Sequence, residues 1–435
     1  MSTKLNETKN IGFDCLGLSE PLLKAIKKSG YTTPSPIQEK AIPIIMKGKD
    51  ILASAQTGTG KTASFALPIL EFLAKSAPNK PPAIKALILT PTRELAAQIL
   101  DNINSYSRYL DISSTAVFGG VNIKPQKTKL AKGIDILVAT PGRLLDLYNQ
   151  KQVQFSSLDI FVLDEADRML DMGFIHDIRK LLKLLPQNRQ TLMFSATFSK
   201  EIKALATKIT KNPAEVSTTP PNTTATSVSQ SIYQVKKPDK AGLLAHLAIK
   251  ESWSQVLIFT KTKHGANKLT RFLNSKNLSA EAIHGNKSQA ARTKALENFK
   301  ANKNKLLIAT DIASRGLDIN QLPLVVNYDL PFVAEDYVHR IGRTGRAGAS
   351  GKAISLVCSE ESKLLSSIQR LIKQTIEIKT CPKFDSESKL NNQKKTHTTF
   401  SSKNKSNSKT PTNNTNKKHK YKFKKKKNSS TLKHQ

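Results

Sequence analysis

Short apolar runs alternate with longer amphipathic segments along most of the chain. In the first half the runs lie at residues 50–55, 86–90, 135–140, 160–164 and 191–197. A continuous apolar run of this length is typical of a strand buried on both faces of a parallel sheet, and the segments between the runs are long enough for helices. The pattern therefore predicts α/β architecture.

The pattern is interrupted once, between residues 213 and 228. Pro, Thr and Ser replace the periodic pattern there, which is typical of a linker. A second series of apolar runs follows at residues 256–260, 306–310, 325–330 and 353–357. We therefore predict two α/β domains. The predicted boundaries are 1–212 for domain 1, 213–228 for the linker, 229–377 for domain 2 and 378–435 for a tail.

The predicted tail, residues 378–435, is rich in Lys, Asn, Ser and Thr. Residues 381–435 contain 16 lysines and only two acidic residues. Such a segment buries too little apolar surface to offset the entropy of ordering, so we predict that it is disordered. Tyr421 and Phe423 lie among the lysines, as in a segment that binds single-stranded nucleic acid. A low-GC genome would enrich Lys and Asn as well, so the composition leaves both explanations open.

The whole chain of 435 residues is strongly basic, with 69 Lys and Arg against 33 Asp and Glu and a formal net charge of +36. Cationic surfaces bind nucleic acid by releasing its counterions, so the composition indicates a nucleic-acid partner. Cys15, Cys358 and Cys381 are far apart, which argues against a disulfide framework or a zinc cluster and fits the cytoplasm. No secretion signal or membrane span is expected from the apolar pattern.

Residues 55–62, AQTGTGKT, follow a predicted strand and precede a predicted helix. This is the context of a phosphate-binding loop, in which backbone N–H groups and the helix N-terminus face the phosphates. Lys61 would reach the β- and γ-phosphates and Thr62 would ligate Mg²⁺. The alternative is a glycine-rich turn before a helix. The candidate ATP-binding residues here are Ala55, Gln56, Thr57, Gly58, Thr59, Gly60, Lys61 and Thr62.

The run at residues 160–164 delivers carboxylates to the end of a buried strand. A nucleotide site needs one acid for the metal ion and another to position or deprotonate water. We assign Asp164 to Mg²⁺ and Glu165 to the attacking water. The alternative is that these acids only favour the first turn of a helix through its dipole.

Residues 164–167 spell D-E-A-D, and together with the companion motifs they resemble the DEAD-box RNA helicases. The resemblance covers about residues 10–375 and is greatest to the bacterial RhlE-type branch. It implies two tandem RecA-like domains and an ATP-dependent, RNA-stimulated enzyme. The companion motifs are Phe13, GYTTPSPIQ ending at Gln38, PTREL from Pro91, GG at 119–120, TPGR from Thr140, SAT from Ser195, HGNKSQAAR from His284, TDIASRGLDI from Thr310 and HRIGRTGR from His339.

The resemblance assigns further roles in ATP binding and hydrolysis. Gln38 would read the adenine edge, and Phe13 or Tyr31 would stack on the base. Gly316 would contact the phosphates and Asp318 the ribose. Arg343 and Arg346 suit the γ-phosphate transition state as fingers from domain 2, because a guanidinium keeps its charge and offers a planar donor fork. An RNA-facing or solvated surface is the alternative for either arginine.

The remaining motifs are expected to link the ATP site to RNA. Asp167, Ser195, Thr197 and His339 would form the coupling network. The RNA motifs combine small residues, Thr and Arg at strand ends and helix starts, a composition suited to holding a sugar-phosphate backbone. Binding of this kind carries little sequence specificity and weakens with salt. The candidate RNA contacts are Pro91, Thr92, Arg93, Gly120, Thr140, Pro141, Gly142, Arg143, Arg292, Thr310 and Asp311.

The sequence thus predicts a monomeric enzyme that uses ATP and Mg²⁺ to open RNA duplexes locally, without long-range translocation. The family's usual settings, ribosome assembly and RNA turnover, supply the expected role and partners. Two other functions remain open. A DNA-translocating motor is disfavoured by the Gln38 motif and the D-E-A-D spelling. A non-catalytic RNA clamp is disfavoured because the catalytic candidates are all present, namely Lys61, Glu165, Arg343 and Arg346.

Overall fold

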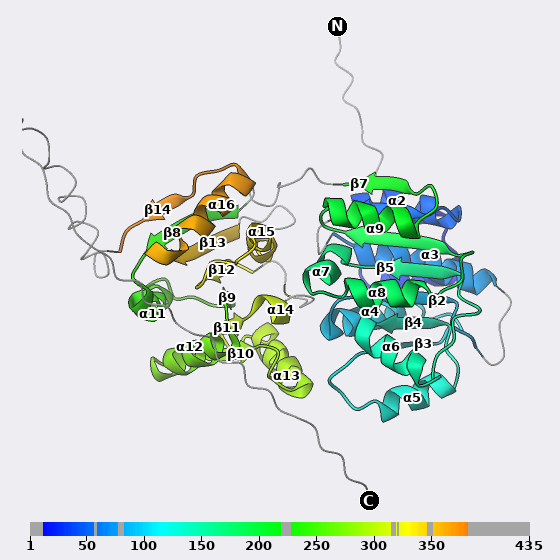
Figure 1. The fold of residues 1–435 in the computed structure, drawn as a ribbon, viewed down its shortest axis with the longest axis horizontal. Helices are drawn as coiled ribbons and strands as arrows, with labels where there is room; N and C mark the ends of the chain where they lie inside the picture. Colours follow the sequence, from blue (N-terminus) through cyan, green and yellow to red (C-terminus); the bar gives the residue numbers. More distant parts are fainter. Residues whose placement is uncertain are drawn as a thin grey trace, which may run out of the picture. The chain divides into compact units, whose positions relative to one another are not determined.

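The computed structural model describes residues 12–55, 59–76, 82–218, 228–314, 319, 322–345 and 351–381, apart from the side chains at 312 and 314. These residues form two seven-stranded sheets in which every pair of neighbouring strands is parallel. Figure 1 shows helices packed on each sheet. The predicted α/β fold with two tandem parallel-sheet domains is therefore confirmed.

The first sheet has the strand order β3-β4-β2-β5-β6-β1-β7. Its strands are β1 (Ile51–Ser54), β2 (Ala86–Leu89), β3 (Ser114–Val117), β4 (Ile136–Ala139), β5 (Ile160–Leu163), β6 (Gln190–Ser195) and β7 (Ala214–Ser217). The helices of this domain are α1 (Glu20–Lys28), α2 (Pro36–Met46), α3 (Lys61–Lys75), α4 (Arg93–Tyr106), α5 (Lys124–Ala131), α6 (Pro141–Asn149), α7 (Ala166–Asp171), α8 (Ile175–Leu182) and α9 (Lys200–Ile209), preceded by the short 3₁₀ helix η1 (Phe13–Leu16).

The second sheet repeats the order of the first, as β10-β11-β9-β12-β13-β8-β14. Its strands are β8 (Val228–Gln234), β9 (Val256–Phe259), β10 (Ala280–Ile283), β11 (Leu306–Ala309), β12 (Leu324–Asn327), β13 (Gly351–Val357) and β14 (Glu377–Lys379). The helices are α11 (Lys240–Lys250), α12 (Lys263–Ser275), α13 (Gln289–Lys300), α14 (Asp311–Ser314), α15 (Ala334–Ile341) and α16 (Ser362–Ile372), with 3₁₀ turns η2 (Lys237–Asp239) and η3 (Ser359–Glu361).

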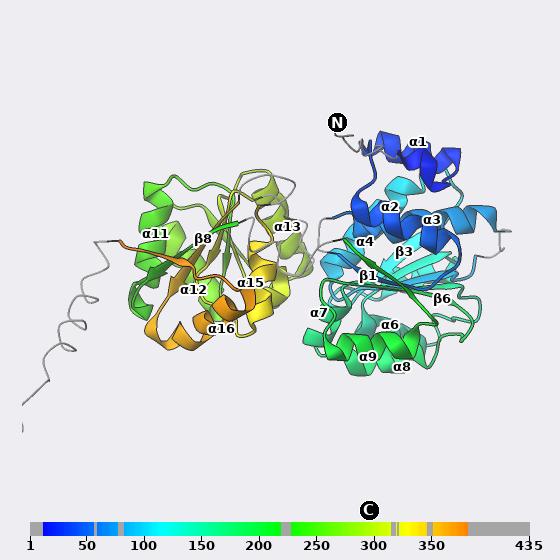
Figure 2. The same ribbon diagram turned by 90° about the horizontal axis from the view of Figure 1, so that it is seen from above.

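Helices cover both faces of the first sheet, with α1 to α4 on one face and α6, α8 and α9 on the other (Figure 2). Strand β5 shows why its sequence is continuously apolar. Ile160 and Val162 belong to the core under α1 to α4, whereas Phe161 and Leu163 belong to the core on the opposite face. Because successive side chains point to opposite faces, a strand covered on both sides needs apolar residues at every position.

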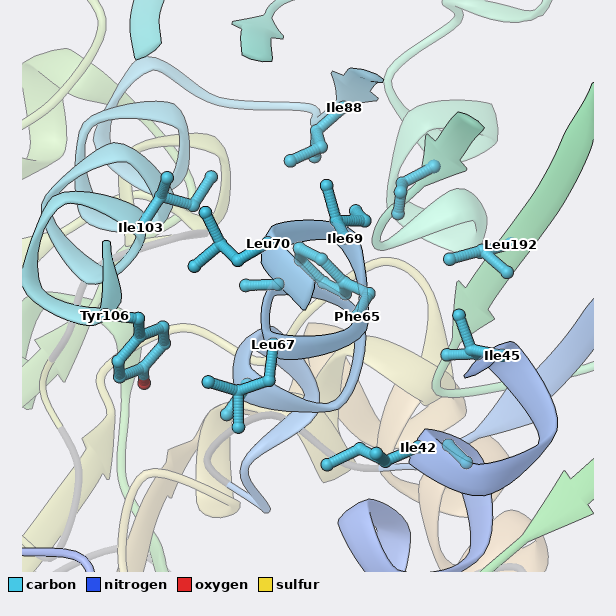
Figure 3. Close-up of a cluster of buried hydrophobic side chains, with 14 of the residues drawn as sticks. Ile42, Ile45, Phe65, Leu67, Ile69, Leu70, Ile88, Ile103, Tyr106 and Leu192 are labelled. Carbon is cyan, nitrogen blue, oxygen red and sulfur yellow. The ribbon is translucent and has the colours of Figure 1, made fainter. Parts of the chain in front are cut away.

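The core under α1 to α4 is centred on α3. Figure 3 shows Phe65 of α3 among side chains of α2, α4 and the strands. Phe65 is fully buried, and its ring meets that of Phe194 from β6 edge-on at a centroid distance of 5.3 Å. This packing fixes α3, which begins at the phosphate-loop lysine, against the sheet.

The predicted linker includes strand β7 and residues 219–227, which lie outside the described part of the chain. Most of the predicted tail also lies outside it, so the boundaries of the linker and the tail stay predictions. Within the described residues, no helix is long and apolar enough to cross a membrane.

We predict that Phe65→Ala lowers the free energy of unfolding by about 3–5 kcal/mol, because it leaves a cavity in a close-packed core. The measurement is urea denaturation, monitored by far-UV circular dichroism. Phe72→Ala is the matched control, since Phe72 lies on the same helix and is 42% exposed. Equal losses in the two variants would contradict the prediction.

Candidate ATP and RNA sites

The candidate ATP-binding motifs of domain 1 meet at one edge of the first sheet. Strand β6 lies between β1 and β5. The phosphate loop follows β1, the D-E-A-D segment follows β5, and Ser195 ends β6. Parallel strands present their carboxyl ends at the same edge, which is where ligands bind in open α/β sheets. The Ala55 N–H donates to the Ser195 carbonyl at 3.2 Å, joining two of the three motifs directly.

The described part of the phosphate loop contains a buried lysine, Lys61, whose ammonium group lacks a hydrogen-bond acceptor. Gly60 adopts a left-handed conformation with φ of +93° at the start of α3. Lys61 is 6% exposed, and among the described residues its Nζ has no hydrogen-bond partner. A buried ammonium without an acceptor is costly unless a ligand supplies one, so the loop fits a phosphate group. Thr59 and Thr62 are half-buried beside it, and Gln56, Thr57 and Gly58 lie outside the described residues.

Gln38 connects the predicted adenine-reading motif to this loop. Its Nε2 donates to the Gly60 carbonyl at 3.1 Å, and its Oε1 accepts from the Ser35 N–H at 2.8 Å. Gln38 is 3% exposed. A Cβ at Gly60 would collide with the Gln38 amide, so only glycine fits there.

The two predicted stacking candidates differ in their surroundings. Phe13 lies in η1 and is buried in the core under α1 to α4. Tyr31 is 45% exposed, and its ring lies 6.3 Å from that of Tyr106 of α4. Phe13 is therefore packed in the core, whereas Tyr31 keeps an exposed ring beside α4.

The D-E-A-D segment holds three buried carboxylates. Glu165 has φ of +52°, a left-handed conformation that is unusual for a non-glycine residue and typical of functional sites. Burial raises the pKa of the Asp164 carboxyl to about 7, with the Lys61 ammonium opposing the rise and the Glu165 carboxylate adding to it. A carboxyl of this kind is poised to bind a cation, which would offset the cost of ionising it in a buried position.

Asp167 ties this segment to the SAT motif. Its Oδ2 accepts from the backbone N–H groups of Ala196 and Thr197, both at 3.1 Å, and from the Thr197 hydroxyl at 3.3 Å. The Ser195 hydroxyl donates to the Thr197 carbonyl at 2.7 Å. The structure therefore brings together three of the four predicted coupling residues, while His339 lies in α15 of domain 2.

The RNA candidates of domain 1 occupy the other half of the same sheet edge. They follow β3, β4 and β2, which are neighbours in the sheet. Thr92 caps α4 by accepting from the Leu95 N–H, and Arg93 begins that helix. The Arg93 guanidinium packs so closely on Gly120 that a Cβ there would overlap it. Gly120 has φ of +72°.

The TPGR motif begins α6, with Thr140 at the N-cap and Pro141 at the first position. Gly142 follows, and Arg143 Nη2 donates to the Val121 carbonyl at 3.1 Å. Arg143 Nη1 is buried and has no hydrogen-bond partner among the described residues. This donor is available to a phosphate oxygen.

In domain 2, Thr310 follows β11 and Asp311 begins α14. Arg340 was not singled out from the sequence, although it stands beside His339 in the HRIGRTGR motif. Its guanidinium forms a bidentate pair with Asp311 at 2.6 and 2.7 Å. Arg340 is 2% exposed and fixes the start of the TDIASRG segment.

Two further domain 2 candidates are buried arginines. Arg292 of α13 is 7% exposed, and its Nη2 lies 3.5 Å from the Ala313 carbonyl. Arg343 is 5% exposed, and its carbonyl accepts from the Leu322 N–H. Gly316, Asp318 and Arg346 lie outside the described residues.

The chain resembles known helicases over most of its length. It matches the families "DEAD/DEAH box helicase" over residues 35–205 and "Helicase conserved C-terminal domain" over residues 239–348. It is 44% identical over 370 residues to the DEAD-box ATP-dependent RNA helicase RhpA of Helicobacter pylori, covering 85% of this chain and 74% of RhpA. It is 43% identical to the RNA helicase CrhR of Synechocystis, over 87% of this chain and 76% of CrhR.

A solved structure shares the fold. The S. cerevisiae Dbp5 structure, bound to RNA and ADP BeF3, has a TM-score of 0.76 and 33% identity, with 88% of this chain and 99% of that chain covered. The two parallel sheets are accordingly RecA-like domains. By its sequence matches and its fold, the chain belongs to the DEAD-box ATP-dependent RNA helicases, enzymes that hydrolyse ATP.

Proposed function

We propose that this helicase couples ATP binding and hydrolysis to local, non-processive unwinding of RNA duplexes. The observation that carries the proposal is the order of the first sheet, which sets the ATP motifs after β1, β5 and β6 beside the RNA motifs after β2, β3 and β4. Asp167 supports it, because the D-E-A-D segment and the SAT motif are hydrogen-bonded to each other. Loss of the γ-phosphate could therefore shift the loop after β6 through the hydrogen bonds of the Asp167 carboxylate.

In this proposal the buried Lys61 ammonium holds the β- and γ-phosphates, and Glu165 orients and deprotonates the attacking water. Gln38 reads the adenine edge. Its amide group has a second N–H and a second oxygen lone pair beyond those used by Gly60 and Ser35. Phe13 or Tyr31 stacks on the base.

Mg²⁺ fits the Thr62 hydroxyl and the Asp164 carboxylate. Within the described residues no group of three or more His, Cys, Asp or Glu side chains could hold a metal ion. Mg²⁺ bound with a nucleotide needs only one or two protein ligands, because water and phosphate oxygens complete its shell. The ion would neutralise charge on the phosphates.

Domain 2 is proposed to complete the site. Arg343 and Arg346 would stabilise the charge that develops on the γ-phosphate, Gly316 would contact the phosphates and Asp318 the ribose. Arginine fingers typically accelerate hydrolysis by roughly 10³ to 10⁵. His339 would connect the fingers to Asp167, Ser195 and Thr197.

RNA is proposed to bind through its backbone. The buried, unsatisfied Nη1 of Arg143 and the N-termini of α4 and α6 suit phosphate oxygens. Such contacts give little sequence specificity, and RNA affinity should fall with salt. In domain 2, Arg292, Thr310 and Asp311 would extend this surface, and the lysine-rich tail would act as an RNA tether through its charge.

We further propose that the chain belongs to the bacterial RhlE-type branch and acts as a cytoplasmic monomer in ribosome assembly or RNA turnover. Its supports are the segments LDEADRMLDMGFIHDI at residues 163–178 and FTKTKHGAN at residues 259–267, and the similarity to bacterial helicases. RNA crosslinking in cells would test the biological setting.

We predict that Arg346→Ala abolishes RNA-stimulated ATP turnover while nucleotide affinity stays near normal, because the finger acts on the transition state. Turnover is measured by phosphate release, and affinity with a fluorescent ATP analogue. Arg370→Ala is the control, since Arg370 is an exposed arginine on α16 of the same domain. A fully active Arg346→Ala enzyme refutes the finger role.

We predict that Gly120→Ala weakens RNA binding roughly tenfold, because a Cβ at positive φ costs about 1–3 kcal/mol and displaces Arg93. Gly119→Ala is the matched control, because a Cβ there meets no atom within 4 Å. Fluorescence anisotropy with labelled single-stranded RNA measures the affinity. ATPase activity without RNA should stay unchanged in both variants, and loss of RNA binding in Gly119→Ala alone would count against the proposal.

We predict that the affinity for Mg²⁺–nucleotide falls as pH drops below about 7, the pKa to which burial raises Asp164. Metal binding needs the ionised carboxylate, so protonation competes with it by up to roughly tenfold per pH unit. Titration of a fluorescent ATP analogue across this range measures the effect, with EDTA and Asp164→Asn as controls for titration of the nucleotide itself. A slope that persists in Asp164→Asn would exclude Asp164 as its source.

A further inference from the structure

A second concave surface lies on the first domain, between α8 and α9. This groove has a volume of about 1110 Å³. The two helices lie on the sheet face opposite α1 to α4 (Figure 2). The groove is also lined by Asp50, which precedes β1, and Thr191, near the start of β6. It therefore reaches the amino ends of these strands, the sheet edge opposite the ATP motifs.

The floor of the groove is aliphatic. Its members are Leu170, Ile175, Leu182, Leu185, Leu205 and Ile209. Leu185, Leu205 and Ile209 are buried, whereas the first three are only half-buried and pack on the edge of the core. The half-buried members leave apolar surface for a partner to cover.

The rim of the groove is cationic. It carries Arg179, Lys183, Arg189, Lys208 and Lys211. Of the two acids in the lining, Asp50 is 7% exposed and already accepts from the backbone N–H groups of Thr191 and Lys211, at 2.8 and 2.6 Å. Glu201 is the other acid, so the surface that the groove presents to a partner is predominantly positive.

Arg189 adds an unsatisfied donor at the end of the groove. Its Nη1 donates to the Pro186 carbonyl, but its Nε is buried and has no hydrogen-bond partner within the described ranges. Arg189 and Lys211 also line an adjoining polar hollow of about 530 Å³. A buried guanidinium N–H without an acceptor points to an acidic ligand.

We propose that the groove between α8 and α9 binds an acidic amphipathic helix of a partner protein. Leucine-like side chains would cover the aliphatic floor, and carboxylates would pair with the rim and with Arg189. The chain itself does not supply this helix, because residues 381–435 hold 16 lysines against two acids and a second copy carries a net charge of +36. Nucleic acid would pair with the rim but would leave the aliphatic floor unmatched.

The test uses a fluorescein-labelled helical peptide of about 18 residues, with leucine at every third or fourth position and glutamate between. Anisotropy with the full chain should report binding that weakens about tenfold in the double variant Lys183→Glu, Lys208→Glu. The matched control is Lys180→Glu, Lys203→Glu, which makes the same change of charge at exposed positions of α8 and α9 outside the groove. The control should bind the peptide like the unaltered chain.

Four further measurements make the outcome decisive. A peptide with lysine in place of glutamate, and one with alanine in place of leucine, should each fail to bind. RNA-stimulated ATPase activity and RNA affinity should both be unchanged in the two double variants. Absence of peptide binding, equal weakening in the two double variants, or a tenfold loss of RNA affinity confined to the groove variant would overturn the proposal, the last in favour of RNA as the occupant.

Discussion

The parallel strand order is the constraint on which the rest of this structure depends. Strand β6 lies between β1 and β5, so their three following segments must meet at one edge of the sheet. Covering both faces with helices demands continuous apolar strands and leaves that edge as the place where polar chemistry can be exposed. The three ATP motifs are far apart in sequence and adjacent in space for this reason alone.

Assembling acids and a cation at such an edge costs stability. Glu165 sits in a left-handed conformation, and Asp164 is so thoroughly desolvated that its pKa rises to about 7. The left-handed conformation of Glu165 costs about 1–3 kcal/mol and persists only where the surroundings hold it in place. Asp167 provides part of that support through three hydrogen bonds to the SAT segment. The same bonds join the D-E-A-D segment to the loop after β6.

The sequence was most informative where strands are central. Each apolar run used to predict the fold corresponds to a strand, such as the fully buried β2, β5 and β9. Five strands were not predicted: the four edge strands β3, β7, β10 and β14, and β8, which lies between β13 and β14 and whose sequence VSQSIYQ has no continuous apolar run. An edge strand such as β7 exposes part of its surface, so it lacks the continuous apolar signal.

Contacts between residues that are far apart in the sequence could not be predicted from motifs either. The motifs identified Gln38 and Asp311 as candidate site residues but did not identify the residues that they contact. The Gln38 amide bonds to Gly60, and Arg340 holds Asp311, through tertiary packing that has no local signature. Of the two partners, Arg340 was the easier to find from the sequence, because it stands beside His339 in the HRIGRTGR motif.

The duplication of the sheet order provides an internal comparison for the phosphate loop. Strand β8 occupies in the second sheet the position of β1 in the first, and the helix that follows the connecting loop begins with a buried lysine in both domains. In domain 2, Lys240 donates to the Tyr328 carbonyl at 2.8 Å and pairs with Glu361. In domain 1, Lys61 is also buried, at 6% exposure against 1% for Lys240, yet its Nζ lacks any hydrogen-bond partner among the described residues. A buried ammonium is stable when an acceptor satisfies it. Since the fold can supply that acceptor from its own chain at Lys240, its absence at Lys61 is best explained by a ligand, and a phosphate is the acceptor that the surrounding loop is built to hold.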